Sequence, residues 1–308
     1  MSSSFPRKIA GYHLLRPIGQ GGMSVVFLGY DPETFNPVAV KILADHLASS
    51  ASCLLRFHRE SRLSRILNHP NLVRGFGSGY DAETKQHYLA LEYIEGTNCH
   101  ALRHGRGRIP VGFAVHVAIQ IADALRYLHD RNYVHRDVKP GNIMVTLLGQ
   151  AKLGDLGLAK RISDSSDLTT PHQGVGTPQY MPYEQLMNSA MVDGRSDLFA
   201  LGATLFHLVT GTVPFPGKTH SEMIREKAAA TPPRIRDLDG DWPVELDAIL
   251  ARALSPCIRQ RYQLAQEFRD DLVQTGLADP ECHPRWKSDD PLILTGEQAP
   301  TAFAGFSR

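Results

Sequence analysis

One short stretch, residues 135–142, brings together three side chains that suit a single reaction. Asp137, Lys139 and Asn142 stand at offsets 0, +2 and +5 in the run His-Arg-Asp-Val-Lys-Pro-Gly-Asn. A carboxylate can accept the proton of an attacking hydroxyl, a cation can neutralise a transferring phosphate, and an amide oxygen can bind a metal ion. The stretch therefore predicts the transfer of a phosphoryl group to a hydroxyl.

A glycine-rich stretch near the amino terminus offers groups that could hold the phosphate donor. Residues 19–24 read Gly-Gln-Gly-Gly-Met-Ser, and Val25, Val26 and Phe27 follow. A dinucleotide-binding loop needs a helix at this point, whereas these residues predict a strand. We expect a hairpin whose backbone amides fold over triphosphate oxygens, although such hairpins also occur as purely structural turns.

A second candidate phosphate loop, Gly217-Lys218-Thr219, fits less well. The P-loop motif requires a glycine five residues before Gly217, and position 212 is Thr. We interpret this segment as a surface loop.

The elements that must position these groups differ between the two parts of the chain. Up to about residue 94, β-branched and aromatic runs predict strands at 12–18, 25–30, 38–43 and 87–93, with one helix at 54–67. On the third strand, alternation places Ala39 and Lys41 on one face. These residues predict a small sheet with one helix.

Beyond Gly96 the periodicity becomes helical. Apolar residues recur at helical spacing over 111–130, 196–210 is apolar nearly all round and ends at Gly211, and 244–254 is a third helical segment. From about 277 onward, Pro, Asp and Gly predict a flexible tail. The chain is expected to be α+β, with a sheet lobe followed by a larger helical lobe.

Several motifs, in this order, resemble the protein kinase family. They are residues 19–26, Val-Ala-Val-Lys at 38–41, the stretch 135–142, Asp-Leu-Gly at 155–157 and Gly-Thr-Pro-Gln-Tyr-Met at 176–181. The form Asp-x-Lys-Pro-x-Asn is typical of Ser/Thr kinases, and the motifs are most similar to those of bacterial members. The resemblance implies a bilobal protein-kinase fold: an extension at 1–11, a small antiparallel-sheet lobe with one regulatory helix at 12–94, a larger, mainly helical lobe at 95–276 and a tail at 277–308.

The resemblance also implies roles for individual residues. Asp137 would accept the hydroxyl proton, Lys139 would neutralise the γ-phosphate, and Lys41 would reach the α- and β-phosphates while paired with Glu60. Mg²⁺ would be held by Asn142 and Asp155. The implied ATP-binding residues are Ile18, Gly19, Gln20, Gly21, Gly22, Met23, Ser24, Val26, Ala39, Lys41, Leu91, Glu92, Ile94 and Met144.

Regulation is implied by the segment between Asp155 and Gly176. Arg136 precedes the acid, and kinases with this arginine commonly pair it with a phosphorylated activation segment. We expect autophosphorylation at Thr169 or Thr170 rather than Ser165 or Ser166, with a homodimer for reaction in trans. The alternative is that this segment is an ordinary solvated polar loop without a regulatory role.

Further positions would support the catalytic stretch. Thr177 would touch it and help to seat the acceptor residue, and Asp197 would brace it through backbone amides. Glu184 would form a buried ion pair with Arg261. Three departures from the family pattern are Ser24 in place of a glycine, Ser64 in place of an apolar residue and Pro-Tyr at 182–183.

Composition limits the classes of protein that fit. Of 308 residues, 42% are apolar and 21% charged, and the formal net charge is +1. These values allow a substantial core but provide no global field for nucleic acid or an anionic membrane. The four cysteines lack zinc or disulfide spacing, which indicates a reduced, cytoplasmic compartment. Neither the Ser-rich start nor the most apolar run, 198–209, predicts a signal sequence or a membrane span.

Two alternatives remain open beside an ATP-dependent protein Ser/Thr kinase. A pseudokinase scaffold that binds ATP without catalysis is suggested by the three departures, but Lys41, Glu60, Asp137, Asn142 and Asp155 are all present. A small-molecule kinase is the other alternative, against which residues 176–181 and Lys139 favour protein acceptors.

Overall fold

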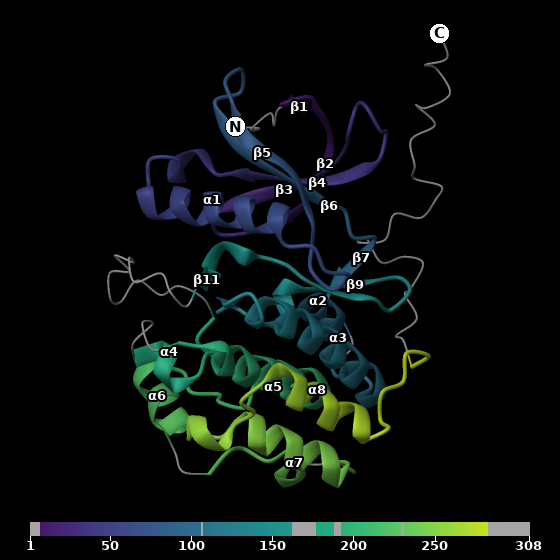
Figure 1. Cartoon of the computed structure of the whole chain (residues 1–308), viewed down its shortest axis with the longest axis vertical. Coiled ribbons are helices and arrows are strands. Elements are labelled where there is room, and N and C mark those ends of the chain that lie inside the picture. The colour runs from purple at the N-terminus through teal and green to yellow at the C-terminus, as the bar shows by residue number, and fades with distance from the viewer. Residues whose placement is uncertain are drawn as a thin grey trace.

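The structure is a computed structural model that describes residues 7–105, 107–161, 177–187, 192–228, 231–238 and 240–282. A smaller lobe of strands with one long helix lies above a larger lobe of helices (Figure 1). The α+β, bilobal organisation expected from the sequence is confirmed.

The small lobe is built on a six-stranded antiparallel sheet with the order β1-β2-β3-β4-β6-β5. Its strands are β1 (Lys8–Ile9), β2 (Tyr12–Gln20), β3 (Ser24–Tyr30), β4 (Pro37–Leu43), β5 (Gly75–Asp81) and β6 (Gln86–Glu92). The four predicted strands are confirmed with small shifts in their ends. The sequence missed β5, whose three glycines are typical of a loop; it forms because β6 pairs with it from Asp81 back to Gly75. Since β1 joins this sheet and Ile9 is fully buried, the predicted extension at 1–11 is partly sheet.

Strand β4 separates two environments. Val38, Val40 and Ile42 point into a cluster with Phe27. On the opposite face Leu43 packs against Phe57 of α1 (Ala51–Ile66), as strand alternation requires. The predicted placement of Ala39 and Lys41 on one face is therefore confirmed, and that face looks toward the helix.

Helix α1 begins three residues before the predicted start. Ser50 caps it by accepting a hydrogen bond from the Cys53 backbone N–H at 3.5 Å, as serine commonly does at this position. The buried residues of α1 include Glu60, a charge that requires a partner inside the lobe.

The large lobe is a helical core with short strands on its upper side. The predicted helices appear as α3 (Val111–His129), α5 (Gly194–Thr210) and α7 (Val244–Ala253), and α2 (Cys99–His104), α4 (Tyr183–Met187), α6 (His220–Ala228) and α8 (Ala265–Gln274) complete it. Strands β7 (Gly96–Asn98), β9 (Ile143–Thr146) and β10 (Ala151–Leu153) form one small sheet, and β8 (Tyr133–Val134) pairs with β11 (Lys160–Arg161). These strands support the 135–142 stretch and Asp155.

Helix α3 lies at the centre of this core. Within the described part of the chain it is the one helix long and apolar enough to cross a membrane, and 56% of that stretch is buried inside the lobe. Its buried side chains pack with those of α5 and α8 in one cluster. We interpret α3 as the core helix of the lobe.

Two further segments can be compared with the sequence: the end of the large lobe, and the predicted surface loop at 217–219, which is a loop with exposed Lys218 and Thr219. Leu277 and Ala278 pack against the core, and the Asp279 backbone N–H donates to the Gly112 carbonyl at 3.1 Å, so the lobe continues past the predicted boundary at 276. The Gly217-Lys218-Thr219 loop leads directly into α6. There the Thr219 hydroxyl accepts a hydrogen bond from the Glu222 backbone N–H, and the Glu222 carboxylate accepts from the Lys218 and Thr219 backbone N–H groups, so these two side chains cap the helix.

Candidate active site

A cavity of about 310 Å³ lies where the sheet lobe meets the 135–155 region. Most of the predicted nucleotide contacts line it. They are Ile18, Gly19, Val26, Ala39, Lys41, Leu91, Glu92, Ile94 and Met144. The wall is mostly apolar, with charged groups gathered at one end, which suits a ligand with a flat ring and a charged tail.

The remaining predicted contacts, Gln20 to Ser24, do not line this cavity. They form the end of β2, the turn and the start of β3, where the Gly21 N–H donates to the Ser24 carbonyl at 2.9 Å. Ser24 itself is buried. The hairpin predicted from the strand-forming residues after the glycines is confirmed, while its contact with phosphates stays a prediction.

Lys41 and Glu60 form a buried ion pair at the charged end. The Lys41 Nζ lies 2.8 Å from Glu60 Oε1 and 2.7 Å from Oε2. Burial alone would lower the pKa of this amine, but the carboxylates of Glu60 and Asp155 outweigh it and raise the pKa above its usual value. Lys41 is therefore a fixed positive charge in the cavity wall, held by a helix and a strand that meet only in the folded lobe.

Asp137 is the acid of the catalytic stretch. It is 8% exposed, and its Oδ2 accepts hydrogen bonds from Lys139 Nζ at 2.8 Å and Asn142 Nδ2 at 2.9 Å. Burial raises the pKa of the carboxyl above its usual value, and Lys139 partly opposes this shift. A carboxylate with a raised pKa is better suited to accept a proton than one in open water.

The catalytic stretch is held in place by Asp197 of α5. Its Oδ2 accepts from the His135 N–H and its Oδ1 from the Arg136 N–H, both at 2.8 Å, while His129 Nε2 lies 2.9 Å from Oδ2. Burial opposes the charge of Asp197, but the hydrogen bond and charge of His129 outweigh it and lower the pKa. Arg136 has φ of 69°, a left-handed conformation that costs energy and needs such anchoring. The predicted bracing of this loop is confirmed.

Asp155 and Asn142 suit a Mg²⁺ ion bound together with phosphates. Burial disfavours the charge of Asp155, but Lys41, His135 and Lys139 outweigh it and lower the pKa, which keeps the carboxylate ionised. The Asn142 amide nitrogen donates to Asp137, which leaves its oxygen as the ligand atom. Among the described residues, no group of three or more His, Cys, Asp or Glu side chains is arranged to hold a metal ion.

The segment below the cleft is tied to the helical core. Arg261 is fully buried and pairs with Glu184 at 2.7 and 3.1 Å, so this predicted ion pair is confirmed. The Thr177 carbonyl accepts a hydrogen bond from Tyr180 at 3.1 Å, while its side-chain contact with the catalytic stretch stays a prediction. Thr169, Thr170, Ser165, Ser166 and Gly176 lie outside the described residues.

Nearly the whole of this two-lobed region matches a known protein family. The family model for the protein kinase domain matches residues 12–272. The chain belongs to the protein kinase family. Relatives include the serine/threonine-protein kinase PknB of Mycobacterium leprae, 34% identical over 281 residues, and that of Mycolicibacterium smegmatis, 34% identical over 297 residues. A probable serine/threonine-protein kinase PknB of Bifidobacterium longum is 34% identical over 287 residues.

These matches cover most of this chain but a smaller share of the relatives. They include 90%, 95% and 89% of this chain, and 45%, 46% and 41% of the three relatives in the same order. The chain therefore spans less than half the length of the curated kinases it matches.

The kinase cleft contains contacts that the sequence did not predict. The Nζ of Lys152, in β10, lies 2.9 Å from Glu92 Oε1. This ion pair holds Glu92, a residue of the cavity wall, in place. Ser64 of α1 lines the cavity, and its Oγ would lie 2.4 Å from a Cβ added at Gly75, so the helix rests directly on the backbone of β5. Neither contact has a local sequence signal, because each joins residues that are distant in the chain.

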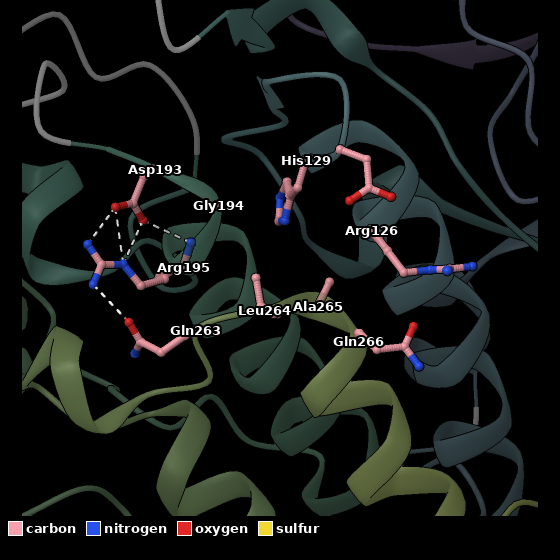
Figure 2. Close-up of a pocket in the computed structure, with 10 residues that line it drawn as sticks. Arg126, His129, Asp193, Gly194, Arg195, Gln263, Leu264, Ala265 and Gln266 are labelled. Carbon is pink, nitrogen blue, oxygen red and sulfur yellow. Dashed lines mark hydrogen bonds and ion pairs between the residues drawn. The ribbon is translucent and has the colours of Figure 1, made fainter.

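A second cavity, of about 480 Å³, lies between the ends of α3, α5 and α8 of the kinase domain (Figure 2). Arg195 is paired with Asp193 and donates to Gln263 (Figure 2). His129 Nε2 lies 2.9 Å from the bracing Asp197. Arg195 and His129 are thus each held by a carboxylate partner.

Proposed function

We propose that this chain is a serine/threonine protein kinase that transfers the γ-phosphate of ATP to Ser and Thr hydroxyls of proteins. The observation that carries the proposal is the meeting of two charged groups at one cavity. Lys41 and Glu60 line it from the sheet lobe, and Asn142 lines it from the helical lobe. Asn142 in turn donates a hydrogen bond to Asp137, which is paired with Lys139. Asp155 lies between the two groups and contributes to the pKa values of both.

In this proposal the nucleotide lies along the cavity. The adenine packs between Val26 and Ala39 on one side and Met144 on the other, at the segment Leu91 to Ile94. Lys41 binds the α- and β-phosphates, and the hairpin at 19–24 covers them. Asn142 and Asp155 would hold Mg²⁺, which would neutralise charge on the phosphates.

In the transfer step, this chain's residues orient the two substrates and take up the proton. The acceptor oxygen forms a bond to the γ-phosphorus while the bond from that phosphorus to the bridging oxygen of ADP breaks. Asp137 orients the hydroxyl and receives its proton. Lys139, 2.8 Å from Asp137, stabilises the negative charge on the transferring group.

The alternatives receive less support from the geometry. A scaffold without catalysis would not need Asp137, Lys139 and Asn142 hydrogen-bonded to one another beside Asp155. A small-molecule kinase would not need residues 177–181 tied to the core below the cleft. We also place the reaction in the cytoplasm, in keeping with the free thiols of Cys53, Cys99, Cys257 and Cys282.

Transfer of radiolabelled γ-phosphate from ATP with Mg²⁺ tests the proposal directly. The wild type is expected to label itself and a basic protein acceptor on Ser and Thr, and Asp137→Asn and Lys41→Met are expected to abolish the label. Matched controls are Asp237→Asn and Lys218→Met, since both residues are exposed and lie outside the cleft. Bound ATP without label in the wild type would instead support the scaffold, and labelled aminoglycosides without labelled protein would support a small-molecule kinase.

Phosphopeptide mapping tests the regulatory part of the proposal. Wild-type protein is expected to carry phosphate on Thr169 or Thr170, with Asp137→Asn as the unlabelled control. Mixing active wild type with that variant tests reaction in trans between two copies, because label on the variant can come only from its partner. Absence of both phosphothreonines in the labelled wild type would contradict the prediction.

A further inference from the structure

Lys227 is a buried lysine that the phosphoryl-transfer chemistry leaves unused. It lies on α6, is 2% exposed, and has no carboxylate ion pair within the part of the chain that the structure describes. Its Nζ instead donates a hydrogen bond to the Gln179 backbone carbonyl at 3.0 Å. An ammonium in this setting loses most of its hydration, so something specific must stabilise it.

Two aromatic rings supply part of that stabilisation. The Nζ lies 4.5 Å from the centroid of the Phe215 ring and 5.5 Å from that of Phe199, and the two rings stack at 5.7 Å. Arg261 lies 4.8 Å from the same Phe199 ring and is itself paired with Glu184. Ring faces attract cations, most strongly where water is excluded. The two rings therefore offset part of the cost of burying the ammonium.

The carbonyl that accepts the hydrogen bond from Lys227 belongs to the segment 177–181. In the proposed function this segment positions the Ser or Thr residue of the protein substrate that accepts the phosphate. The neighbouring Tyr180 is fixed as well, because its hydroxyl lies 2.6 Å from His207 Nδ1 of α5. Two side chains of the helical core thus hold two adjacent residues of this segment. Neither contact reaches the nucleotide cavity.

We propose that Lys227 is a positioning residue that fixes the Gln179 carbonyl and so sets the affinity of the kinase for its protein acceptor. This inference rests on the proposed function. A methionine of similar length would fill the space without desolvating a charge, so the amine is explained by the carbonyl it binds. Binding of ATP is expected to be independent of Lys227.

The charge of Lys227 changes close to neutral pH. Burial lowers the pKa of its amine to about 7, and Glu226 on the same helix opposes this only in part. The other groups facing this site are the Glu184–Arg261 pair, Tyr180 and His207. Burial lowers the pKa of His207 to about 4 and raises that of Tyr180 to about 12, so neither changes charge near pH 7. Since a neutral amine makes the weaker hydrogen bond, acceptor affinity should fall as the pH rises through about 7.

Steady-state kinetics at about pH 6 to 8.5 test the proposal with the full chain, ATP, Mg²⁺ and myelin basic protein as the acceptor. Lys227→Met is expected to raise the acceptor KM about tenfold at pH 6 and to leave the ATP KM unchanged, as loss of one charge-assisted hydrogen bond would do. In the wild type the acceptor KM should rise toward that of the variant as the pH increases. Lys218→Met, an exposed lysine just before α6, is the matched control.

Hydrogen–deuterium exchange gives a second measurement that needs no activity. The amides of 177–181 are expected to exchange faster in Lys227→Met than in the wild type, while those of α1 stay unchanged. Unaltered exchange in this segment, or an acceptor KM and pH profile equal to those of the wild type, would overturn the proposal. A wild type that transfers no phosphate would refute the proposed function, and the exchange result would then decide about Lys227 alone.

Discussion

Lys41 in the cleft and Lys227 beneath the acceptor segment are both buried lysines, and they have opposite properties. Lys41 faces Glu60 at 2.7 Å and Asp155 nearby, and its pKa is raised. Lys227 faces two phenylalanine rings and a carbonyl, and its pKa is lowered to about 7. Burial opposes the charge at both sites, so the presence of a carboxylate decides the direction.

The comparison shows how one fold provides two kinds of cation. A reaction that handles phosphates needs an amine that is charged at every working pH, and a carboxylate partner guarantees this. A lysine that donates to a neutral peptide carbonyl, as Lys227 does, can bind it without being charged at every pH. Without Lys41, the carboxylate of Glu60 would stay buried and unpaired. Without Lys227, only two aromatic rings and a carbonyl group would remain, and none of them is charged.

The largest effect on catalysis is expected from a substitution of Asp137, the acid of the catalytic stretch. Asp137→Asn should lower kcat about thousandfold, because the amide cannot take the hydroxyl proton, and should leave the ATP KM nearly unchanged. Steady-state kinetics with Asp237→Asn as control would show this. A drop confined to ATP affinity would mean that Asp137 acts in binding rather than in proton transfer.

Replacing Lys41 tests how much the stability of the protein depends on the Lys41–Glu60 ion pair. Lys41→Met should lower the free energy of unfolding by about 3 kcal/mol at pH 7, because Glu60 stays buried without its cation. Urea unfolding would measure this, and a second change, Glu60→Leu, should recover much of the loss. If the single variant were as stable as the wild type, the ion pair would contribute little and the contrast with Lys227 would weaken.

The close approach of α1 and β5 offers a way to disturb the ion pair without touching it. A Cβ at Gly75 would lie 2.4 Å from Ser64 Oγ and 3.1 Å from the Ser64 carbonyl carbon, so Gly75→Ala should push α1 outward. We expect a loss of about 2 kcal/mol in stability and a reduced kcat/KM. Gly105→Ala, with 3.7 Å to its nearest neighbour, is the control. Equal effects of both alanines in urea unfolding and kinetics would contradict the close-packing argument.

The smallest expected effect on stability is at Lys227, where the substitution should stabilise the protein rather than destabilise it. Lys227→Met should raise the free energy of unfolding by about 1 kcal/mol at pH 6, since a buried charge is replaced by an apolar side chain. The pKa falls from the usual 10.5 to about 7 on folding, so between these values the unfolded chain binds the proton and the folded chain does not.

Wild-type stability should accordingly gain on that of the variant as the pH rises from about 7 to 10.5. Thermal unfolding across this range would measure the difference, with Lys218→Met as control. A variant that is less stable than the wild type at every pH would indicate that the ammonium contributes net stability.

Much of the cleft could be predicted because its motifs are local. Asp137, Lys139 and Asn142 lie within one loop, and their hydrogen bonds follow from that spacing once the loop is held. The strand alternation that pairs Ala39 with Lys41 is equally local. Helix α6 was missed because it is short and mostly polar, and strand β5 was missed because its three glycines are typical of a loop.

The sequence by itself determined the family, the two lobes and the chemistry of the cleft, because these depend on residue types at short, regular spacings. Only the tertiary structure decided which lysine has a carboxylate and which has aromatic rings. Phe199, Phe215, Gln179 and Lys227 come from four segments of the large lobe, and Lys41 and Glu60 come from a strand and a helix. The properties of a buried charge depend on what surrounds it, and those surroundings are assembled only when distant segments pack together.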